Sequence, residues 1–388
     1  MINKLKFNLS ITFFKILFLF INLLFIYKYG LRQNHISVYY AVLAYGLVAG
    51  FLLYKNIFDY NFARNIKLKK IYIIICLLVA LSIFTITFIT NGNTLNVDRW
   101  SAMDVAIRAF LNGEYPYIAV DHLQGRTSNF PGLLILGIPF YLLGNVGYLQ
   151  VFAFLLLSYT LYLYLNIKEA FRYLLLFLIS PAYWWEIFAI SDLMSNTIIV
   201  LCFIILLKHK LKTTVLEYPI FLGFSTSFLV LTRGIFAIPL TLLVFKDFCN
   251  TNITNQLKYV FSFSITFIVL ITIVLMNCPD LETLKRCNPL VLQAHYLPNY
   301  IHILALMLPF YFSFKIKKFN NDFFKISSFL ILFPTLLAFI YTWDSVGFEE
   351  IILKSRFDLS YLSIVIPFIL IEIVQNKNKV ANEYLTEL

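Results

Sequence analysis

Apolar blocks long enough to form membrane-spanning helices repeat along almost the whole chain, with short polar stretches between them. A helix needs about 20 predominantly apolar residues to cross the hydrocarbon core of a bilayer. The pattern therefore predicts an all-α polytopic membrane protein with about 12 transmembrane helices, in a range of about 11–13. The predicted spans are a first run that ends near Ile26, then Ile36–Tyr54, Ile71–Thr90, Gly132–Leu165, Tyr173–Ile190, Leu193–Leu207, Glu217–Thr232, Ile235–Phe245, Tyr259–Met276, Pro298–Phe314, Lys325–Thr342 and Leu359–Val374.

The longest interruption of this pattern is the polar stretch Asn91–Pro131, which carries four acidic residues, three arginines and one histidine. A chain embedded in lipid can place such a stretch only in water or at the headgroup surface. Two sets of positions within it follow helical spacing. The apolar set is Trp100, Met103, Ile107 and Phe110, and the polar set is Ser101, Asp104, Arg108 and Asn112. This spacing predicts a short amphipathic helix that lies on the bilayer surface and ends near Gly113.

Most of the positive charge lies in short loops between the apolar blocks, and the formal net charge is +11. Short basic loops of membrane proteins face the cytoplasm. The basic loops lie near Lys55–Lys70, Lys208–Lys212 and Lys315–Lys318. Alternation then places the polar stretch on the outside, together with the later loops Asn277–Leu297 and Trp343–Asp358. The charge is explained by this topology, so we predict one membrane domain over residues 1–388, a lipid bilayer as partner and no nucleic-acid partner.

The block Gly132–Leu143 is about 12 residues long and contains Pro139. It is short for a crossing, and we predict a re-entrant segment there. The charge pattern agrees. Two basic stretches, Ile167–Arg172 and Lys208–Lys212, follow this block, with two predicted spans between them. Both stretches are cytoplasmic only if Gly132–Leu165 crosses the membrane once.

Candidate chemistry begins at Asp98 and Arg99, at the start of the predicted amphipathic helix, where the helix dipole favours an anion. A carboxylate held at a membrane interface can take a proton from an acceptor hydroxyl. The residues alone favour a plainer interpretation, in which Asp98 is an N-terminal helix residue in a solvated loop. Glu186 and Asp192 are acids at or near membrane depth, where charge is costly and usually functional. The sequence contains no Walker loop, no Gly-rich dinucleotide turn and no H-E-x-x-H metal spacing.

Four short motifs follow one another through this region: D-R-W at residues 98–100, G-E-Y-P-Y at 113–117, S-N-F-P-G-L-L at 128–134 and I-P-F-Y at 138–141. Together they resemble the first outer loop of GT-C glycosyltransferases, in particular the branch of bacterial mannosyltransferase-like proteins. The segment I-S-P-A-Y-W-W-E-(x)5-D at residues 179–192 is similar to the outer S-P…D segment of that superfamily. The resemblance covers residues 97–207, and the rest of the chain matches only in hydropathy and in single basic residues.

The resemblance implies an enzyme that transfers a sugar from a polyprenyl-phosphate carrier to a glycan, lipid or protein acceptor outside a bacterial inner membrane. It implies that the early acid, Asp98 here, acts as a base or as a metal-associated carboxylate. Arg99 stands where several relatives carry a second acid, so a divalent metal is left open and Asp104 is the substitute acid. We also expect Arg99, Tyr117, Glu186 and Asp192 to contact substrate or phosphate.

A lipid-linked phosphate needs cationic partners near the level of the headgroups. Two arginines are the candidates: Arg233 in the turn T-R-G-I-F, and Arg356 in L-K-S-R-F-D-L just before the last predicted span. Snorkelling of the two side chains to the headgroups explains both positions equally well.

Two other functions share this kind of sequence. One is an O-antigen or capsule-type polysaccharide polymerase or ligase, which would place its main polar loop in the later half of the chain. The other is a lipid-linked glycan flippase or transporter, which would need polar residues along the middle of several spans. Cys278 and Cys287 flank a short polar loop, and a disulfide between them is left open because spacing alone does not decide it.

Overall fold

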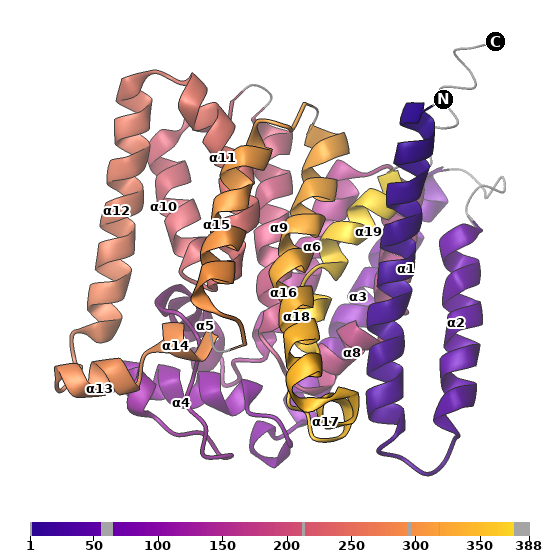
Figure 1. Ribbon diagram of the computed structural model, residues 1–388, viewed down its shortest axis with the longest axis horizontal. Helices are drawn as coiled ribbons and strands as arrows, with labels where there is room; N and C mark the ends of the chain where they lie inside the picture. The colour runs from indigo at the N-terminus through magenta and orange to yellow at the C-terminus, as the bar shows by residue number, and fades with distance from the viewer. Residues whose placement is uncertain (1, 56–64, 212–213, 294–295, 318, 376–388) are drawn as a thin grey trace. The chain divides into compact units, whose positions relative to one another are not determined.

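The computed structural model describes residues 2–55, 65–211, 214–293, 296–317 and 319–375 (Figure 1). These residues form helices joined by turns, and within them there is no β-sheet beyond one isolated bridge between Val120 and Arg126. The all-α prediction is thus confirmed for the described chain. Within the described residues, five helical segments are able to cross a membrane by length and composition, as in a multi-pass membrane protein. They are Ser10–Gly30, Lys67–Ile89, Leu193–Lys210, Ile253–Leu275 and Phe324–Val346.

The chain divides into two compact units. Unit 1 comprises Met1–Val79, Ser158–Trp185 and Lys318–Leu388, and unit 2 comprises Ala80–Leu157 and Glu186–Lys317. The single membrane domain over residues 1–388, the re-entrant segment 132–143 and the full count of about 12 spans stay predictions.

Unit 1 is built around α1, which packs against α2 and α19, while α19 also packs against α7 and α16. A hydrogen bond of 2.9 Å from the Arg32 guanidinium to the Ser355 hydroxyl joins the end of α1 to the turn after α17. These two ends therefore lie on one side, as the charge pattern predicts. The helices of unit 1 are α1 (Ile2–Gly30), α2 (Val38–Tyr54), the first part of α3 (Asn65–Ile89), α7 (Ile167–Leu178), α8 (Pro181–Phe188, in part), α16 (Phe324–Val346), α17 (Phe348–Leu353), α18 (Ser360–Ser363) and α19 (Ile366–Gln375).

The predicted span Tyr173–Ile190 is wrong, because two helices, α7 and α8, occupy that region. Pro181 cannot donate the backbone hydrogen bond that would continue α7, so the helix ends. The Asn22 amide oxygen accepts hydrogen bonds from the Ser180 hydroxyl at 2.6 Å and from the Ala182 N–H at 3.2 Å. A buried polar side chain thus satisfies the broken backbone.

The basic stretch Ile167–Arg172, predicted as a loop, is instead the first half of α7. Asn166 and Glu169 form a reciprocal capping box that begins the helix there. Arg172 is buried and donates a hydrogen bond of 3.0 Å to the Leu53 carbonyl.

Unit 2 contains two close helix pairs, α10 with α12 and α11 with α15. Gly223 allows the first pair to approach closely, because a Cβ there would lie 2.5 Å from the Tyr259 carbonyl oxygen. The helices of unit 2 are α4 (Arg99–Leu111), α5 (Pro131–Leu142), the first half of α6 (Tyr148–Tyr164), α9 (Leu193–Lys210), α10 (Pro219–Val230), α11 (Ala237–Asn250), α12 (Ile253–Leu275), α13 (Leu281–Arg286), α14 (Pro289–Gln293) and α15 (Asn299–Ser313).

The two loops of unit 2 that are predicted to face outside lie at one end of the unit, where Figure 1 shows α4, α13 and α14. The Tyr115 hydroxyl donates to the Cys287 carbonyl at 3.3 Å, and the Gln293 amide donates to the Ser128 carbonyl at 2.7 Å. The later loop, Asn277–Leu297, is therefore hydrogen-bonded to the polar stretch. Within it, Cys278 and Cys287 are both free thiols.

Two of the loops with basic residues lie together elsewhere in unit 2. Asp247 of α11 lies 3.8 Å from the Lys208 ammonium and accepts the Val215 N–H at 3.0 Å. The neighbouring Lys246 donates to the Ile316 carbonyl at 2.8 Å. The loops that follow α9 and α15 therefore share a side of the unit, as the charge pattern requires.

The helix predicted inside the polar stretch is confirmed as α4, and Gly113 follows it with a φ of +76°. Glycine adopts this left-handed conformation without strain, so the helix ends there. The predicted polar face is wrong in part, because Ser101 and Asp104 are buried while Arg108 and Asn112 are exposed. α4 packs against α5 and against two turns of its own loop, which cover more than one face of the helix.

Candidate functional site

Asp98 occupies the N-cap position of α4, directly before Arg99. Its side chain forms no capping hydrogen bond, and among the described residues its carboxylate has no hydrogen-bond or ion-pair partner. The side chain is half-buried and lies near the positive end of the helix dipole. A half-buried carboxylate without a protein partner is able to accept a proton from a bound group.

The first turn of α4 is fixed by Trp100. Its indole N–H donates to the Asn145 side-chain oxygen at 2.8 Å, and the Asn145 amide donates to the Thr87 carbonyl at 2.9 Å. The indole also lies directly on Gly92, where a Cβ would come within 2.1 Å of it. These contacts bind the start of α4 to the turn between α5 and α6, so the Asp98 backbone has little freedom.

His122 closes the polar stretch onto α4. Its Nε2 lies 2.7 Å from the Leu95 carbonyl, and its Nδ1 lies 2.6 Å from the Ser101 hydroxyl. A carbonyl only accepts, so Nε2 carries a proton in the contact with Leu95, and the Ser101 hydroxyl lies between Nδ1 and the Asp98 carbonyl, to which it donates at 3.1 Å. Because Ser101 is fully buried, this pair holds the loop together and presents no exposed nucleophile.

Asp192 lies at the N-cap position of α9 and forms a buried ion pair. An Arg233 terminal nitrogen donates to Asp192 Oδ2 at 2.7 Å, with side-chain exposures of 3% for Arg233 and 4% for Asp192. The same nitrogen donates to the Asn129 side-chain oxygen at 3.3 Å. The pair therefore connects three segments, namely the end of the polar stretch, the start of α9 and the turn after α10.

Glu186 accepts a hydrogen bond from a backbone N–H in the first turn of α9. Its Oε2 accepts the Met194 N–H at 3.0 Å, a hydrogen bond that an N-cap side chain would otherwise provide. Asp192 forms no side-chain cap of its own. Glu186 thereby leaves the Asp192 carboxylate to Arg233, and it does not line either of the cavities described next.

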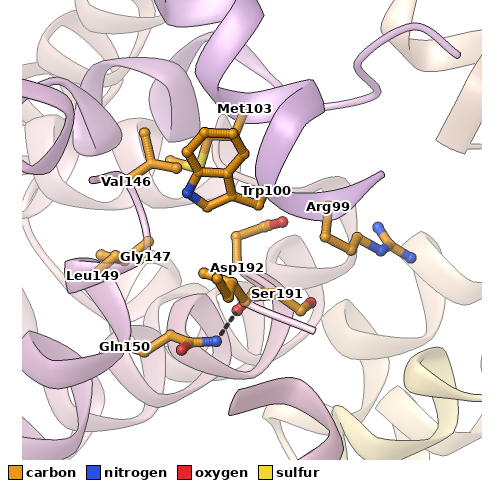
Figure 2. A pocket seen from close by; sticks show the side chains of 10 residues that line it. Arg99, Trp100, Met103, Val146, Gly147, Leu149, Gln150, Ser191 and Asp192 are labelled. Carbon is orange, nitrogen blue, oxygen red and sulfur yellow. Dashed lines mark hydrogen bonds between the residues drawn. The ribbon is translucent and has the colours of Figure 1, made fainter. Parts of the chain in front are cut away.

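Two small cavities meet at Arg99 and Asp192. The first is lined by Asp98, Arg99, Ala102, Arg126, Thr127, Ser128, Asn129 and Asp192. The second, drawn in Figure 2, is lined by Arg99, Trp100, Met103, Val146, Gly147, Leu149, Gln150, Ile190, Ser191 and Asp192. Their volumes are about 20 Å³ and about 10 Å³, on the order of one water molecule each.

The first cavity is polar. Its lining contains two carboxylates, Asp98 and Asp192, and two arginines, Arg99 and Arg126. Arg233, paired with Asp192, adds a third guanidinium directly behind the wall. Three positive and two negative groups leave a formal charge of +1, which suits a ligand that carries one negative charge.

The other residues predicted for the site lie away from the two cavities. Asp104 pairs with Arg108 at 2.6 Å one helical turn along α4, and burial raises the pKa of its carboxyl against the opposing effect of Arg108. Tyr117 is buried in unit 2 with its ring edge-on to Tyr115, and burial raises the pKa of its hydroxyl. Arg356 belongs to unit 1, 4.0 Å from Glu350.

Among the residues of the site that escaped the sequence-based prediction are two from the first cavity and one from the second. Arg126 and Asn129 line the first cavity from the end of the polar stretch, and Gln150 lines the second. A signal for Gln150 was present, because it is a lone amide near the start of a long apolar run. No comparable signal separates Arg126 from Arg108, because both are arginines of one polar stretch.

Within the described residues, no group of three or more His, Cys, Asp or Glu side chains could hold a metal ion. No metal ligands are therefore assigned, and the chemistry below is derived from the residues of the chain.

Comparison with protein-family models, with curated proteins and with solved structures finds no match for this chain.

Proposed function

We propose that this chain is a membrane glycosyltransferase that moves a sugar from a polyprenyl-phosphate carrier to an extracytoplasmic acceptor, such as a surface glycan, a glycolipid or a glycoprotein. One observation carries the proposal. Asp98, the acid singled out by the resemblance to GT-C enzymes, lines a cavity together with two arginines and the paired Asp192. A base next to cationic groups is the arrangement that transfer from a lipid phosphate requires.

In the proposed reaction, the Asp98 carboxylate takes the proton of an acceptor hydroxyl. The acceptor oxygen then bonds to the anomeric carbon, and the bond from that carbon to the phosphate oxygen breaks. The electron pair of the broken bond stays on the phosphate, which leaves with the lipid. Inversion at the anomeric carbon follows from the resemblance alone.

The positive cavity favours the products of bond breaking over the donor. A sugar linked to a polyprenyl phosphate carries one negative charge, and the departing phosphate carries nearly two at neutral pH. Arg99 and Arg126 line the cavity in which that charge develops. Arginine is suited to this role because its planar fork binds two phosphate oxygens at once. Arg233 supports the wall through Asp192 and Asn129, and is not itself a phosphate ligand in this arrangement.

The cavity must widen before a sugar phosphate can bind, because its volume of about 20 Å³ holds about one water molecule. Its polar wall, residues 126–129, is held by side chains from two other segments. The Gln293 amide donates to the Ser128 carbonyl, and Arg233 donates to the Asn129 side chain. Loops of this kind commonly open and close around substrates.

The decisive experiment compares Asp98→Asn with Asp104→Asn in membranes supplied with radiolabelled polyprenyl-phosphate sugars. Both variants replace a carboxylate of the same helix by an amide of similar size, and only Asp98 lines the cavity. Loss of a general base lowers the rate by about 10²–10⁴-fold. We expect that loss for Asp98→Asn and transfer close to that of the unaltered protein for Asp104→Asn.

Equal transfer by Asp98→Asn and the unaltered protein would contradict the site. The nature of the product separates the other functions. Accumulation of capped single repeat units after deletion of the protein would indicate a polymerase or ligase. Transport by purified protein in liposomes without sugar transfer would indicate a flippase.

The proposed location of the site outside the membrane is tested separately. Leu123 is an exposed residue of the polar stretch, and Lys210 is exposed at the end of α9. A cysteine is placed at each position in a chain in which Cys249 and Cys278 are replaced by serine. In intact cells, a membrane-impermeant maleimide should label position 123 and leave position 210 unlabelled until the cells are permeabilised. The reverse pattern would exclude the scheme.

A further inference from the structure

The turn that carries Asp192 contains a strained residue. Ile190 has a φ of +46°, a conformation that a β-branched side chain rarely adopts. The Ser191 N–H donates to the Glu186 carbonyl at 2.9 Å, which closes the turn directly before Asp192. Strain of this kind persists only where the surrounding structure holds it, and it gathers at functional sites.

Gln150 of α6 is the side chain that holds this turn. Its amide nitrogen donates one hydrogen bond to the Glu186 carbonyl at 2.7 Å and one to the Ser191 carbonyl at 3.0 Å. In Figure 2 the bond to Ser191 is the dashed line drawn below the Trp100 indole. Gln150 is 3% exposed, so bulk water has little access to these bonds. A neutral side chain with two N–H donors matches two adjacent buried carbonyls.

The side chain of Ile190 also holds this residue in place. A Cβ on Gly147 would lie 2.3 Å from Ile190 Cγ2, so the isoleucine packs directly against the backbone one turn before Gln150. The start of α6 therefore contacts the turn twice, through the side chain of Ile190 and through the carbonyls around it. Asp192 follows at once, with its carboxylate against Arg233 and on the wall of both cavities.

We propose that Gln150 is a positioning residue, whose amide holds the strained turn Glu186–Asp192 in the conformation that presents the Asp192 carboxylate to Arg233 and to the cavities. The consequence for catalysis depends on the proposed function, whereas the effect on the turn does not. If Gln150 only packed against its neighbours, removing the strain at Ile190 would not compensate for the loss of the Gln150 amide.

The relation to Ile190 provides the test. Gln150→Leu keeps the approximate size of the side chain and removes both donors. Ile190→Gly removes the strain, because glycine adopts a positive φ freely. In the double variant the turn no longer needs to be held, so the native conformation should return. If Gln150 only fills space, the double variant should be worse than either single variant.

The first readout is hydrogen–deuterium exchange of the full-length protein in nanodiscs. We expect Gln150→Leu to raise the exchange rate of residues 190–194 at least tenfold, and the double variant to restore slow exchange. The second readout is sugar transfer. A displacement of about 1 Å at the site costs on the order of 100-fold in rate, so kcat should fall by about 10- to 100-fold and recover in the double variant.

Gln256 supplies a matched control. Its amide also donates to two carbonyls, of Phe248 at 2.8 Å and Thr251 at 3.3 Å, in the turn between α11 and α12. Gln256→Leu should raise exchange in that turn and leave transfer unchanged. Gln150→Glu keeps the size of the side chain and replaces the NH2 group, which donates both hydrogen bonds, by a carboxyl oxygen. It is the second variant where Gln150→Leu does not accumulate in the membrane.

Unchanged exchange at residues 190–194 in Gln150→Leu and Gln150→Glu would overturn the proposal, and so would additive damage in the double variant. If the unaltered protein transfers no sugar while the exchange pattern follows the expectation, the positioning role stands and the proposed function fails. The two ideas are thus separable by the same set of variants.

Discussion

Arg233 and Arg356 lie in two short turns that the sequence describes in the same terms, and the structure gives them opposite surroundings. The Arg233 side chain is 3% exposed and bonded to Asp192 and Asn129. The Arg356 side chain is 65% exposed and only 4.0 Å from Glu350. Proximity to a membrane boundary is therefore a poor guide to the role of an arginine. Burial and a fixed partner make Arg233 a supporting element, whereas exposure leaves Arg356 able to meet a ligand.

The largest expected effect comes from breaking the buried pair. Asp192→Ala leaves the Arg233 guanidinium buried and uncompensated, and should destabilise the protein by about 3–5 kcal/mol. Arg233→Ala should cost a similar amount. The measurement is the unfolding free energy of the purified protein in detergent. The double variant Asp192→Leu/Arg233→Met should be more stable than either single variant, because no charge remains buried. Single variants within about 1 kcal/mol of the unaltered protein would contradict the buried pair.

A smaller effect is expected from the backbone contact that places the Arg233 turn. The Gly132 N–H donates to the Leu231 carbonyl at 2.8 Å, and a Cβ on Gly132 would lie 2.6 Å from the Phe228 carbonyl oxygen. Gly132→Ala must displace rigid backbone, which costs about 1–3 kcal/mol.

Gly50→Ala is the matched change for Gly132→Ala. Gly50 lies in α2, and a Cβ there would meet nothing within 4 Å. It should stabilise the helix by about 0.5–1 kcal/mol through the lower entropy of the unfolded chain. Thermal unfolding of both variants gives the comparison. If Gly132→Ala and Gly50→Ala both stabilised the protein, the backbone around Gly132 would not be rigid.

The smallest effect on stability is expected at Arg356. An exposed pair of this kind contributes about 0–1 kcal/mol, and added salt screens it. Arg356→Ala should therefore change the unfolding free energy by less than about 1 kcal/mol, and by less at high salt. If Arg356 binds the donor phosphate, the same variant should raise the KM for the donor severalfold. An unchanged KM would remove Arg356 from the site, while a large loss of stability would show that its surroundings differ from those described.

The sequence predicted the helix α4 and its end at Gly113 because both depend on local properties. Apolar residues at helical spacing and a glycine that tolerates positive φ act within a few residues of each other. The prediction of a single span over Tyr173–Ile190 failed because a hydropathy pattern does not show where one apolar helix ends and the next begins. Pro181 was visible, but the Asn22 side chain that satisfies the broken backbone lies 158 positions away from Ser180.

The candidate site shows the same limit. The sequence selected Asp98, Arg99 and Asp192, and these three line the same cavity. It also selected Glu186 and Asp104, whose carboxylates are engaged by the Met194 N–H and by Arg108. The sequence does not distinguish an acid that lines the cavity from one that is bonded elsewhere, because the partner of each acid is set by long-range packing.

The sequence by itself determined that this chain is helical and largely apolar, because the length and period of its hydrophobic blocks suffice for that. Only the tertiary structure decided that Asp192 pairs with Arg233, 41 residues later in the chain, and that Gln150 supports the turn between them. Spacing along a chain carries no information on which buried polar groups meet. The high cost of leaving such a group without a partner decides it once the helices are packed.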